Sequence, residues 1–429
     1  MIKIQRTNSN FEIQPFLAPF GFKGGYCSSG WQSIAMMESE NGHRGVGTGT
    51  QGTLWSDARV FVENSEAAGN AFMYLMTDHA LKAAREIPFE TPLDLLDALL
   101  PITYEYGKKI TGNDALRLTY ALNSLVAVDN AAWQVYCAEN GITSFDDMVP
   151  VDIRPALAHR QKQLASIPLM SYNVPLKDIV AAIEGGCFFL KIKIGSDPDK
   201  DGDQDKMLEW DKARLTAIHG AAKHIEIPYT NDGHIPYYLD ANGRYDSKER
   251  LMKLLDHADK IGALSRIMIM EEPFPEEYKV DVRDIPVRLA ADESAHSDKD
   301  ALERIELGYG AVALKPIAKT MSMSLRIARI AHDRGIPCFC ADLTVSPILV
   351  DWNKNVAARL APLPGMKVGV LESNGHQNYV NWEAMKSYHP CNGAPWMETV
   401  RGLFNLDDDF YAKSGGILMP SEHYSNLAK

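Results

Sequence analysis

The pattern of apolar and polar positions changes twice along the chain and divides it into three parts. Residues 1 to about 65 are β-rich and interrupted by glycines, which is typical of strands joined by turns. From about residue 67 to Gly141, apolar side chains recur with a helical period of 3.6 residues, and Asn140-Gly141 ends this pattern. A β-rich segment followed by helices predicts an N-terminal α+β domain over residues 1–150.

Strand-like and helix-like segments then alternate to about residue 375, which is the pattern of a parallel β/α domain. The predicted strands lie at about 167–174, 188–194, 236–241, 267–272, 287–293, 311–316, 337–343 and 368–373. Eight parallel strands can close as a barrel. We therefore predict an α/β fold, a (β/α)8-type, modified TIM-like barrel over residues 151–375 with the α+β domain as its cap. Residues 376–429 are expected to pack back on the cap.

Two glycine-rich stretches of the N-terminal part are predicted to be loops. Phe16–Cys27 is apolar and aromatic but contains three glycines, which favours a mobile loop over a strand. Gly47–Trp55 is the second such stretch. Either is a lid over a site or only a turn-rich connection. The gap between the second and third barrel strands also contains an acidic stretch and a turn-rich insertion, for which the sequence predicts no function.

Composition and charge narrow the class of protein. The 429 residues are 45% hydrophobic and 23% charged, as in an ordinary soluble globular protein. The net charge of −12 argues against a nucleic-acid partner and against an anionic membrane surface. No signal-like or membrane-spanning apolar run is present in the sequence, so we expect a cytoplasmic protein. The six cysteines contain no Cys-x-x-Cys pair for zinc or redox chemistry.

Charged residues stand at the ends of five predicted strands. The steps from Asp240 to Glu271, Asp292 and Lys315 are 31, 21 and 23 residues, which suits one strand–helix unit each. A barrel would bring these ends to one mouth, together with Lys191 and Lys193. Charged strand ends are usually only solvated, but five in chain order make that interpretation weak. Three carboxylates are the ligands that Mg²⁺ prefers, with Mn²⁺ as an alternative.

This residue set suits the removal of a proton next to a carboxylate. A divalent cation stabilises the enediolate that forms, and a lysine with a depressed pKa is a usable base. Lys191 and Lys193 point the same way on their strand, so each is expected to lower the pKa of the other. Lys315 would face the substrate from across the barrel, and Asn242 is a candidate supporting residue. A base on each face of one carbon permits racemisation or epimerisation, but the same machinery also permits cycloisomerisation or dehydration.

These motifs resemble those of a known family. Lys-Ile-Lys at 191–193, Leu-Asp-Ala-Asn around Asp240, Glu-Glu-Pro from Glu271, Ala-Asp-Glu-Ser around Asp292 and Leu-Lys-Pro around Lys315 are similar to the enolase superfamily. The similarity is to the muconate-lactonising-enzyme-like branch of the mandelate racemase/muconate lactonising enzyme family, which includes dipeptide epimerases and succinylbenzoate synthases. It extends over nearly the whole chain.

The resemblance implies a role for each of these positions. Asp240, Glu271 and Asp292 would bind Mg²⁺, Lys193 and Lys315 would be the acid/base pair, and Lys191 would support Lys193. Glu293 fits the partner of the sixth-strand lysine. Val-Leu-Glu-Ser at 370–373 makes Glu372 a candidate near the substrate, and Tyr26 and Trp55 are candidates from the capping segments. The Asp-x-Asp with which dipeptide epimerases hold an ammonium group on this eighth strand is absent.

The expected function is therefore metal-dependent abstraction of the α-proton of a small-molecule carboxylate substrate, most simply in a racemase or epimerase. A cycloisomerase or a dehydratase/lyase acting on an acid remains an alternative. An alternative of another class is a catalytically silent metal-binding barrel that acts as a scaffold. The resemblance also implies a homo-oligomer.

Overall fold

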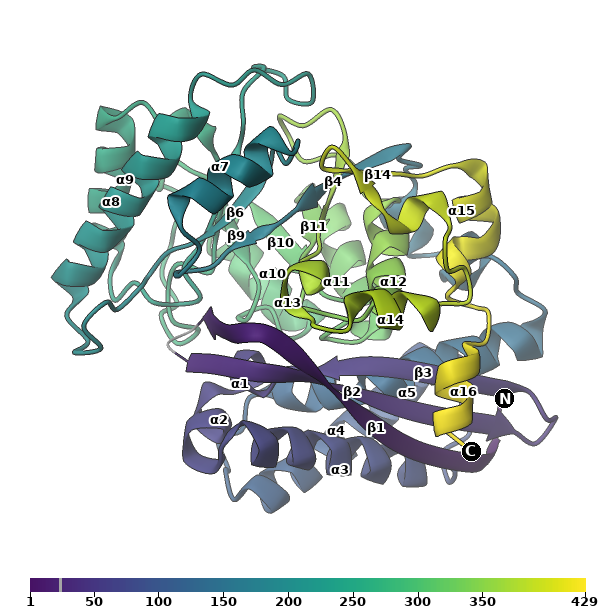
Figure 1. The fold of residues 1–429 in the computed structure, drawn as a ribbon. Coiled ribbons are helices and arrows are strands. Elements are labelled where there is room, and N and C mark those ends of the chain that lie inside the picture. The colour runs from purple at the N-terminus through teal and green to yellow at the C-terminus, as the bar shows by residue number, and fades with distance from the viewer. Residues whose placement is uncertain (23–24) are drawn as a thin grey trace.

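The computed structural model describes residues 1–22 and 25–429. An antiparallel N-terminal sheet with its helices lies against the mouth of a β/α barrel, and the C-terminal helix returns to the N-terminal sheet (Figure 1). The predicted fold class, an α/β barrel with an N-terminal α+β domain, is confirmed. The boundaries predicted at residues 150 and 375 stay a prediction.

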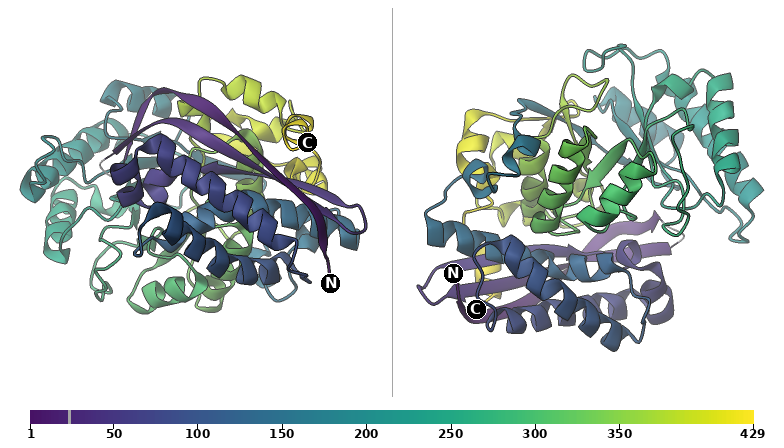
Figure 2. Two further views of the ribbon diagram at one scale, coloured as in Figure 1. Left: turned by 90° about the horizontal axis from the view of Figure 1, so that it is seen from below. Right: turned by 180° about the vertical axis from the view of Figure 1, so that it is seen from behind.

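The N-terminal part is one sheet of three long strands with helices packed on one face. The strands, in the order β1-β2-β3, are β1 Ile4–Phe22, β2 Gly25–Ser39 and β3 Arg44–Gln51, all antiparallel. Figure 2 shows the helices side by side beneath this sheet. The long helices are α3 Glu66–Ala84, α4 Pro92–Thr111 and α5 Leu118–Asn140. The short helices of this part of the chain are α1 Thr53–Ser56, α2 Ala58–Asn64 and α6 Phe145–Met148.

The prediction of two loops in this part of the chain is wrong. Phe20 pairs with Cys27 across β1 and β2, so Phe16–Cys27 belongs largely to a hairpin; Lys23 and Gly24 lie outside the described residues. Gly47–Trp55 forms most of β3 and the start of α1. The glycines have another cause, because a Cβ on Gly47 would stand 2.1 Å from the backbone oxygen of Ala127 in α5. They mark close packing of helix on sheet rather than turns.

Helix α5 confirms the helical period read from the sequence and joins the two parts of the molecule. It ends at Gly141, whose φ of +65° is left-handed, as glycine after a helix usually is. Asp129 of α5 accepts hydrogen bonds from the backbone N–H of Ser322 at 3.0 Å and from its hydroxyl at 2.5 Å. Trp133 donates to the same hydroxyl at 3.0 Å. Buried polar contacts thus fix α5 on the barrel helix α11, Met321–Asp333, near its first turn.

The barrel is closed by eight parallel strands, the first of which is interrupted at Pro168. Its first half pairs with the eighth strand and its second half pairs with the second, which completes the ring. In chain order the strands are β4 Gln163–Ile167 with β5 Leu169–Met170, β6 Leu190–Lys193, β7 Tyr237–Asp240, β8 Ile267–Glu271, β9 Leu289–Ala291, β10 Ala311–Leu314, β11 Cys338–Cys340 and β12 Gly369–Glu372.

Seven of these strands lie where the sequence predicts them, and the first does not. The prediction of 167–174 starts too late, because residues 163–167 already pair with β12 and the chain leaves the sheet after Met170. Proline has no N–H for a strand ladder, which explains the break at Pro168.

The helices on the outside of the barrel are α7 Leu176–Glu184, α8 Gln204–Ala222, α9 Lys248–Lys260, α10 Asp298–Glu306, α11 Met321–Asp333 and α12 Pro347–Ala357.

The C-terminal segment divides between the two parts. Strand β14 Leu403–Asn405 pairs antiparallel with β4 and extends the barrel sheet, with β13 Thr399–Val400 at its edge. Helix α16 Glu422–Leu427 instead lies beside β1, where Asn10 donates to the backbone oxygen of Leu427 at 2.9 Å (Figure 1). The remaining helices are α13 Gly375–Asn378, α14 Trp382–Ser387 and α15 Asp408–Lys413. Across the described chain, none of the helices combines the length and apolar character needed to cross a bilayer.

Candidate active site

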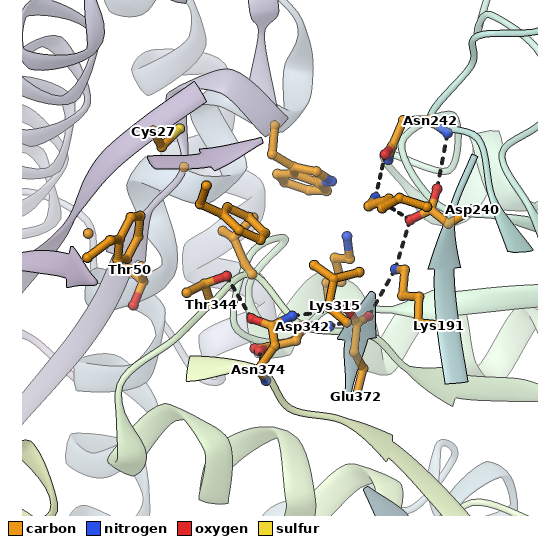
Figure 3. Close-up of a pocket in the computed structure, with 18 of the residues that line it drawn as sticks. Cys27, Thr50, Lys191, Asp240, Asn242, Lys315, Asp342, Thr344, Glu372 and Asn374 are labelled. Atoms are coloured by element: carbon orange, nitrogen blue, oxygen red, sulfur yellow. Dashed lines mark hydrogen bonds and ion pairs between the residues drawn. The ribbon is translucent and has the colours of Figure 1, made fainter. Parts of the chain in front are cut away.

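A pocket lies between the mouth of the barrel and the N-terminal sheet (Figure 3). Charged and polar side chains at the ends of barrel strands form one side of it, and aromatic and polar side chains from β1 to α1 form the other. The described lining residues are Phe16, Phe20, Cys27, Ser29, Gly30, Thr50, Gln51, Gly52, Trp55, Leu169, Lys191, Lys193, Asp240, Asn242, Lys315, Asp342, Leu343, Thr344, Glu372 and Asn374.

Strand register places the charged ends at one level. Lys193 of β6 is opposite Asp240 of β7, and Asp240 is opposite Glu271 of β8. Because side chains alternate along a strand, Lys191 and Lys193 both point toward the barrel interior and its mouth. All of these side chains are buried.

Lys191 is surrounded by carboxylates. Its Nζ lies 2.7 Å from Oε2 of Glu271, 2.9 Å from Oδ2 of Asp240 and 3.0 Å from Oε2 of Glu372. The hydroxyl of Tyr238 donates to the same oxygen of Glu271 at 2.5 Å. Lys191 therefore compensates much of the negative charge in the centre of the barrel.

Lys193 lies nearer the mouth. Its Nζ is 2.5 Å from Oδ2 of Asp240, and it also donates to the side-chain oxygen of Asn242. Asn242 in turn donates to Oε1 of Glu293 at 2.7 Å. Asn242 thus connects the second-strand lysine to the fifth-strand glutamate, which gives it the supporting position expected from the sequence.

Lys315 approaches the pocket from the opposite side of the barrel. Three strands separate β6 from β10 in either direction around the ring, so Lys193 and Lys315 belong to opposite walls. Nζ of Lys315 lies 2.5 Å from Oδ2 of Asp292 and 4.5 Å from the ring centroid of Trp55. Lys319, four residues further along the chain, is buried and lies 3.2 Å from Oδ1 of Asp292.

The carboxylates, rather than the lysines, dominate the electrostatics. Burial disfavours charged Lys191, but attraction from Asp240, Glu271 and Glu372 outweighs it and raises the pKa of Lys191 well above its usual value. The pKa of Lys315 is also raised, since attraction from Asp292 and Glu271 exceeds the cost of burial. The expectation that the neighbouring lysine lowers the pKa of Lys191 is therefore wrong, because three carboxylates contact its ammonium group.

The three carboxylates suit a divalent cation in their chemistry but do not form a binding site for it as they stand. Burial and repulsion from Asp240 and Asp292 raise the pKa of Glu271 well above its usual value, and its buried Oε1 accepts no hydrogen bond from a described residue. Such oxygens fit a hard cation. Across residues 1–22 and 25–429, however, no three His, Cys, Asp or Glu side chains are arranged to hold a metal ion.

The other predicted residues divide into two groups. Trp55 and Glu372 line the pocket, whereas Glu271, Asp292 and Glu293 lie buried behind the lining. Tyr26 is 49% exposed and is not a lining residue; its neighbour Cys27 lines the pocket instead.

Sequence reasoning missed one polar cluster of the pocket. Asp342 and Thr344 follow β11, and Asn374 follows β12. Thr344 donates to Oδ1 of Asn374 at 2.7 Å, and the backbone N–H of Asn374 donates to Oδ2 of Asp342 at 2.8 Å. The same rule that selected Asp240 would have found Asp342, because it too follows an apolar strand.

Comparison with known proteins agrees with this fold. Residues 176–370 match the family described as Enolase C-terminal domain-like. These residues include β6 to β11 and the start of β12. They contain the charged strand ends Lys191, Lys193, Asp240, Glu271, Asp292 and Lys315, whereas Glu372 lies two residues beyond the match. The resemblance to the enolase superfamily is thereby confirmed. The comparison with curated protein sequences gives no match.

Solved structures similar to the chain have the same fold at low sequence identity. A dipeptide epimerase from Enterococcus faecalis V583, complexed with Mg and the dipeptide L-Leu-L-Tyr, is 18% identical, with a TM-score of 0.64 over 94% of this chain and 97% of that one. A mandelate racemase/muconate lactonizing protein from Herpetosiphon aurantiacus is 17% identical, with a TM-score of 0.63 over 95% and 96%. The L-Ala-D/L-Glu epimerase from Bacillus subtilis is 16% identical, with a TM-score of 0.59 over 89% and 91%.

Proposed function

We propose that this protein is an enzyme that removes the α-proton of a small carboxylate substrate and returns a proton to the opposite face, as a racemase or epimerase. The observation that carries the proposal is the placement of Lys193 and Lys315 on opposite walls of one buried pocket. A planar enediolate between two such groups can be protonated from either side.

Lys193 and Lys315 are the acid and base. One takes the α-proton as a neutral amine, and the other donates a proton as an ammonium ion. Lys191 holds Lys193 in place indirectly, since both contact Oδ2 of Asp240. Trp55 covers the ammonium group of Lys315 and helps to exclude water from it.

Asp240, Glu271 and Asp292 are the residues that would hold Mg²⁺, with Mn²⁺ as an alternative. A cation bound there would supply positive charge opposite the negative charge that develops on the substrate carboxylate. Two similar structures carry Mg and a dipeptide, which supports this assignment and the proposal of a small-molecule substrate. Binding of Mg²⁺, measured by calorimetry, is expected to weaken at least tenfold in Glu271→Gln, because that variant loses one of the three charged ligands.

The two lysines favour a racemase or epimerase over a cycloisomerase or a lyase, because a lyase needs only one base. Exchange with inversion at the α-carbon would support it, and formation of an alkene would favour the lyase. A silent scaffold is disfavoured, since all six charged strand-end positions carry suitable residues. A cytoplasmic location and a homo-oligomeric state remain part of the proposal.

The test is incubation with Mg²⁺ and a panel of hydroxy acids, acylated amino acids and dipeptides in D₂O, with α-deuterium followed by NMR. The wild-type protein is expected to exchange at least one substrate, and Lys193→Ala to abolish exchange of the enantiomer whose α-proton Lys193 removes. Lys206→Ala is the matched control, because Lys206 is an exposed lysine that pairs with Asp199 and Asp201. Absence of exchange across the panel with metal bound would favour the scaffold.

A further inference from the structure

Asp342 is a buried carboxylate in the pocket that the proposed reaction does not use. It is only 5% exposed and lines the pocket at the end of β11. Oδ2 accepts the hydrogen bond from Asn374, but the buried Oδ1 accepts none of normal geometry from the described chain. A buried carboxylate oxygen without a partner is costly, so this position requires an explanation.

The charge of Asp342 is also not balanced. Lys191 pairs with the neighbouring Glu372, whereas no lysine, arginine or histidine among the described residues forms an ion pair with Asp342. Burial, followed by repulsion from Glu372, raises the pKa of Asp342 to about 7, although nearby backbone amides oppose the rise. A cationic ligand would supply the missing partner.

The polar groups around Asp342 are already committed to one another. Asn374 uses its side-chain oxygen for Thr344 and its N–H₂ for Oε1 of Glu372 at 3.2 Å. The backbone N–H of Asp342 donates to Oε2 of Glu372 at 2.9 Å. This frame fixes the carboxylate, and Oδ1 is the atom that it leaves available.

Asp342 also lies at a useful place relative to the lysines. In Figure 3, Asp342, Thr344 and Asn374 gather on one side of Glu372, while Lys191 and Asp240 lie on the other. Apolar side chains of Phe16, Phe20 and Leu343 line the same pocket. A substrate whose carboxylate end is held near the lysines would therefore extend along an apolar wall toward Asp342.

We infer that Asp342 is a specificity residue that binds a cationic nitrogen of the substrate, remote from the carbon that loses its proton. The substrate class is then a carboxylic acid with an α-hydrogen and a protonated amine at its other end. This inference rests on the proposed function and deepens it. The competing explanation is that Asp342 only anchors the turn after β12 through Asn374.

The test compares substrates that differ only in that charge. Dipeptides with a free amino terminus are paired with their des-amino analogues, and Nα-acetyl-lysine is paired with Nα-acetyl-norleucine, in the D₂O exchange assay. We expect kcat/KM to favour at least one cationic member by tenfold or more. Asp342→Asn should reduce that preference at least tenfold, because kcat/KM falls more for the cationic member of each pair than for the neutral one.

A matched variant and a binding measurement complete the design. Asp211→Asn replaces another buried aspartate, which lies outside the pocket lining and has a pKa raised to about 7, and it should leave the preference unchanged. Calorimetry should show the cationic ligands binding wild type at least tenfold more tightly than Asp342→Asn, whether or not exchange occurs. A preference that survives in Asp342→Asn, or equal binding to both proteins, would overturn this inference. Exchange absent from wild type would contradict the proposed reaction instead.

Discussion

Lys191 on the second barrel strand forms an ion pair with Glu372 on the eighth, at 3.0 Å, across the interrupted first strand that lies between them. The same ammonium group contacts Asp240 and Glu271. One lysine thus offsets three buried carboxylates at the point where the barrel closes.

Removal of that ammonium group is expected to destabilise the fold strongly. Lys191→Met would leave three carboxylates without their shared partner, and breaking a buried ion pair costs about 3–5 kcal/mol. Urea unfolding in the presence of a chelator measures this cost. Lys206→Met, at a position with a 46% exposed side chain, should change the free energy of unfolding by less than about 1 kcal/mol. Equal effects of the two variants would contradict the central role of Lys191.

The contact between α5 and α11 predicts a difference between two serines of one helix. Ser322→Ala removes the hydroxyl that bonds Asp129 and Trp133, and should cost about 1–3 kcal/mol. Ser324 is also buried on α11, but its hydroxyl has no hydrogen-bond partner in the described structure. Ser324→Ala should therefore be neutral or stabilising. Thermal unfolding of both variants measures the two losses of stability. A loss in Ser322→Ala no larger than that in Ser324→Ala would contradict the importance of the Ser322 contact.

Close packing of β3 on α5 predicts opposite signs for two glycine substitutions. Gly47→Ala would press a methyl group against the backbone of α5, so we expect a loss of about 1–3 kcal/mol or more. Gly220 lies within α8, where a Cβ meets nothing within 4 Å. Gly220→Ala should stabilise the protein by about 0.5–1 kcal/mol through helix propensity and lower chain entropy. Denaturant unfolding distinguishes the two, and a tolerated Gly47→Ala would contradict the packing explanation.

Asp211 predicts a pH dependence of stability. Burial raises the pKa of this carboxyl to about 7, although bonds from Tyr245 and the backbone of Gly195 favour the charged form. The folded state binds the proton of Asp211 more tightly than the unfolded state does, so the protonated carboxyl stabilises the folded protein. This contribution is fully present below the unfolded pKa of about 3.9 and is lost as pH rises toward 7.

Asp211→Asn resembles the protonated acid and should not show this loss. Its free energy of unfolding relative to wild type should therefore increase between pH 4 and pH 7.5, by at most about 4 kcal/mol. Asp199→Asn, at an exposed position, should show no such change. A constant difference between Asp211→Asn and wild type across this range would contradict the raised pKa.

The sequence was sufficient for the barrel because its strands are short, buried apolar runs, and charge at their ends is easily recognised. Seven strands and the helix that ends at Gly141 follow from this pattern. The prediction from the sequence failed at Pro168, where one strand is split. It also failed at Gly47, where the glycine allows a close approach of helix and sheet that only the tertiary structure reveals. The first error comes from placing Pro168 inside one continuous strand, and the second from reading glycine as a turn signal alone.

The candidate site shows the same division. Lys191, Lys193, Asp240 and Lys315 could be located because strand ends of a barrel converge. The pKa values of these groups could not be predicted, because the effects of burial, carboxylates and ammonium groups on each pKa depend on distances of a few ångströms. Asp342 was within reach of the strand-end rule, but its lack of a partner is visible only in the structure.

The most direct test of the central claim is α-proton exchange in D₂O measured separately for the two enantiomers of one accepted substrate. If Lys193 and Lys315 serve opposite faces of the substrate, the exchange rate of one enantiomer should fall at least 100-fold in Lys193→Ala, while the other enantiomer still exchanges. Lys315→Ala should show the reverse pattern. Loss of both enantiomers in one variant, with full retention in the other, would contradict a two-base mechanism.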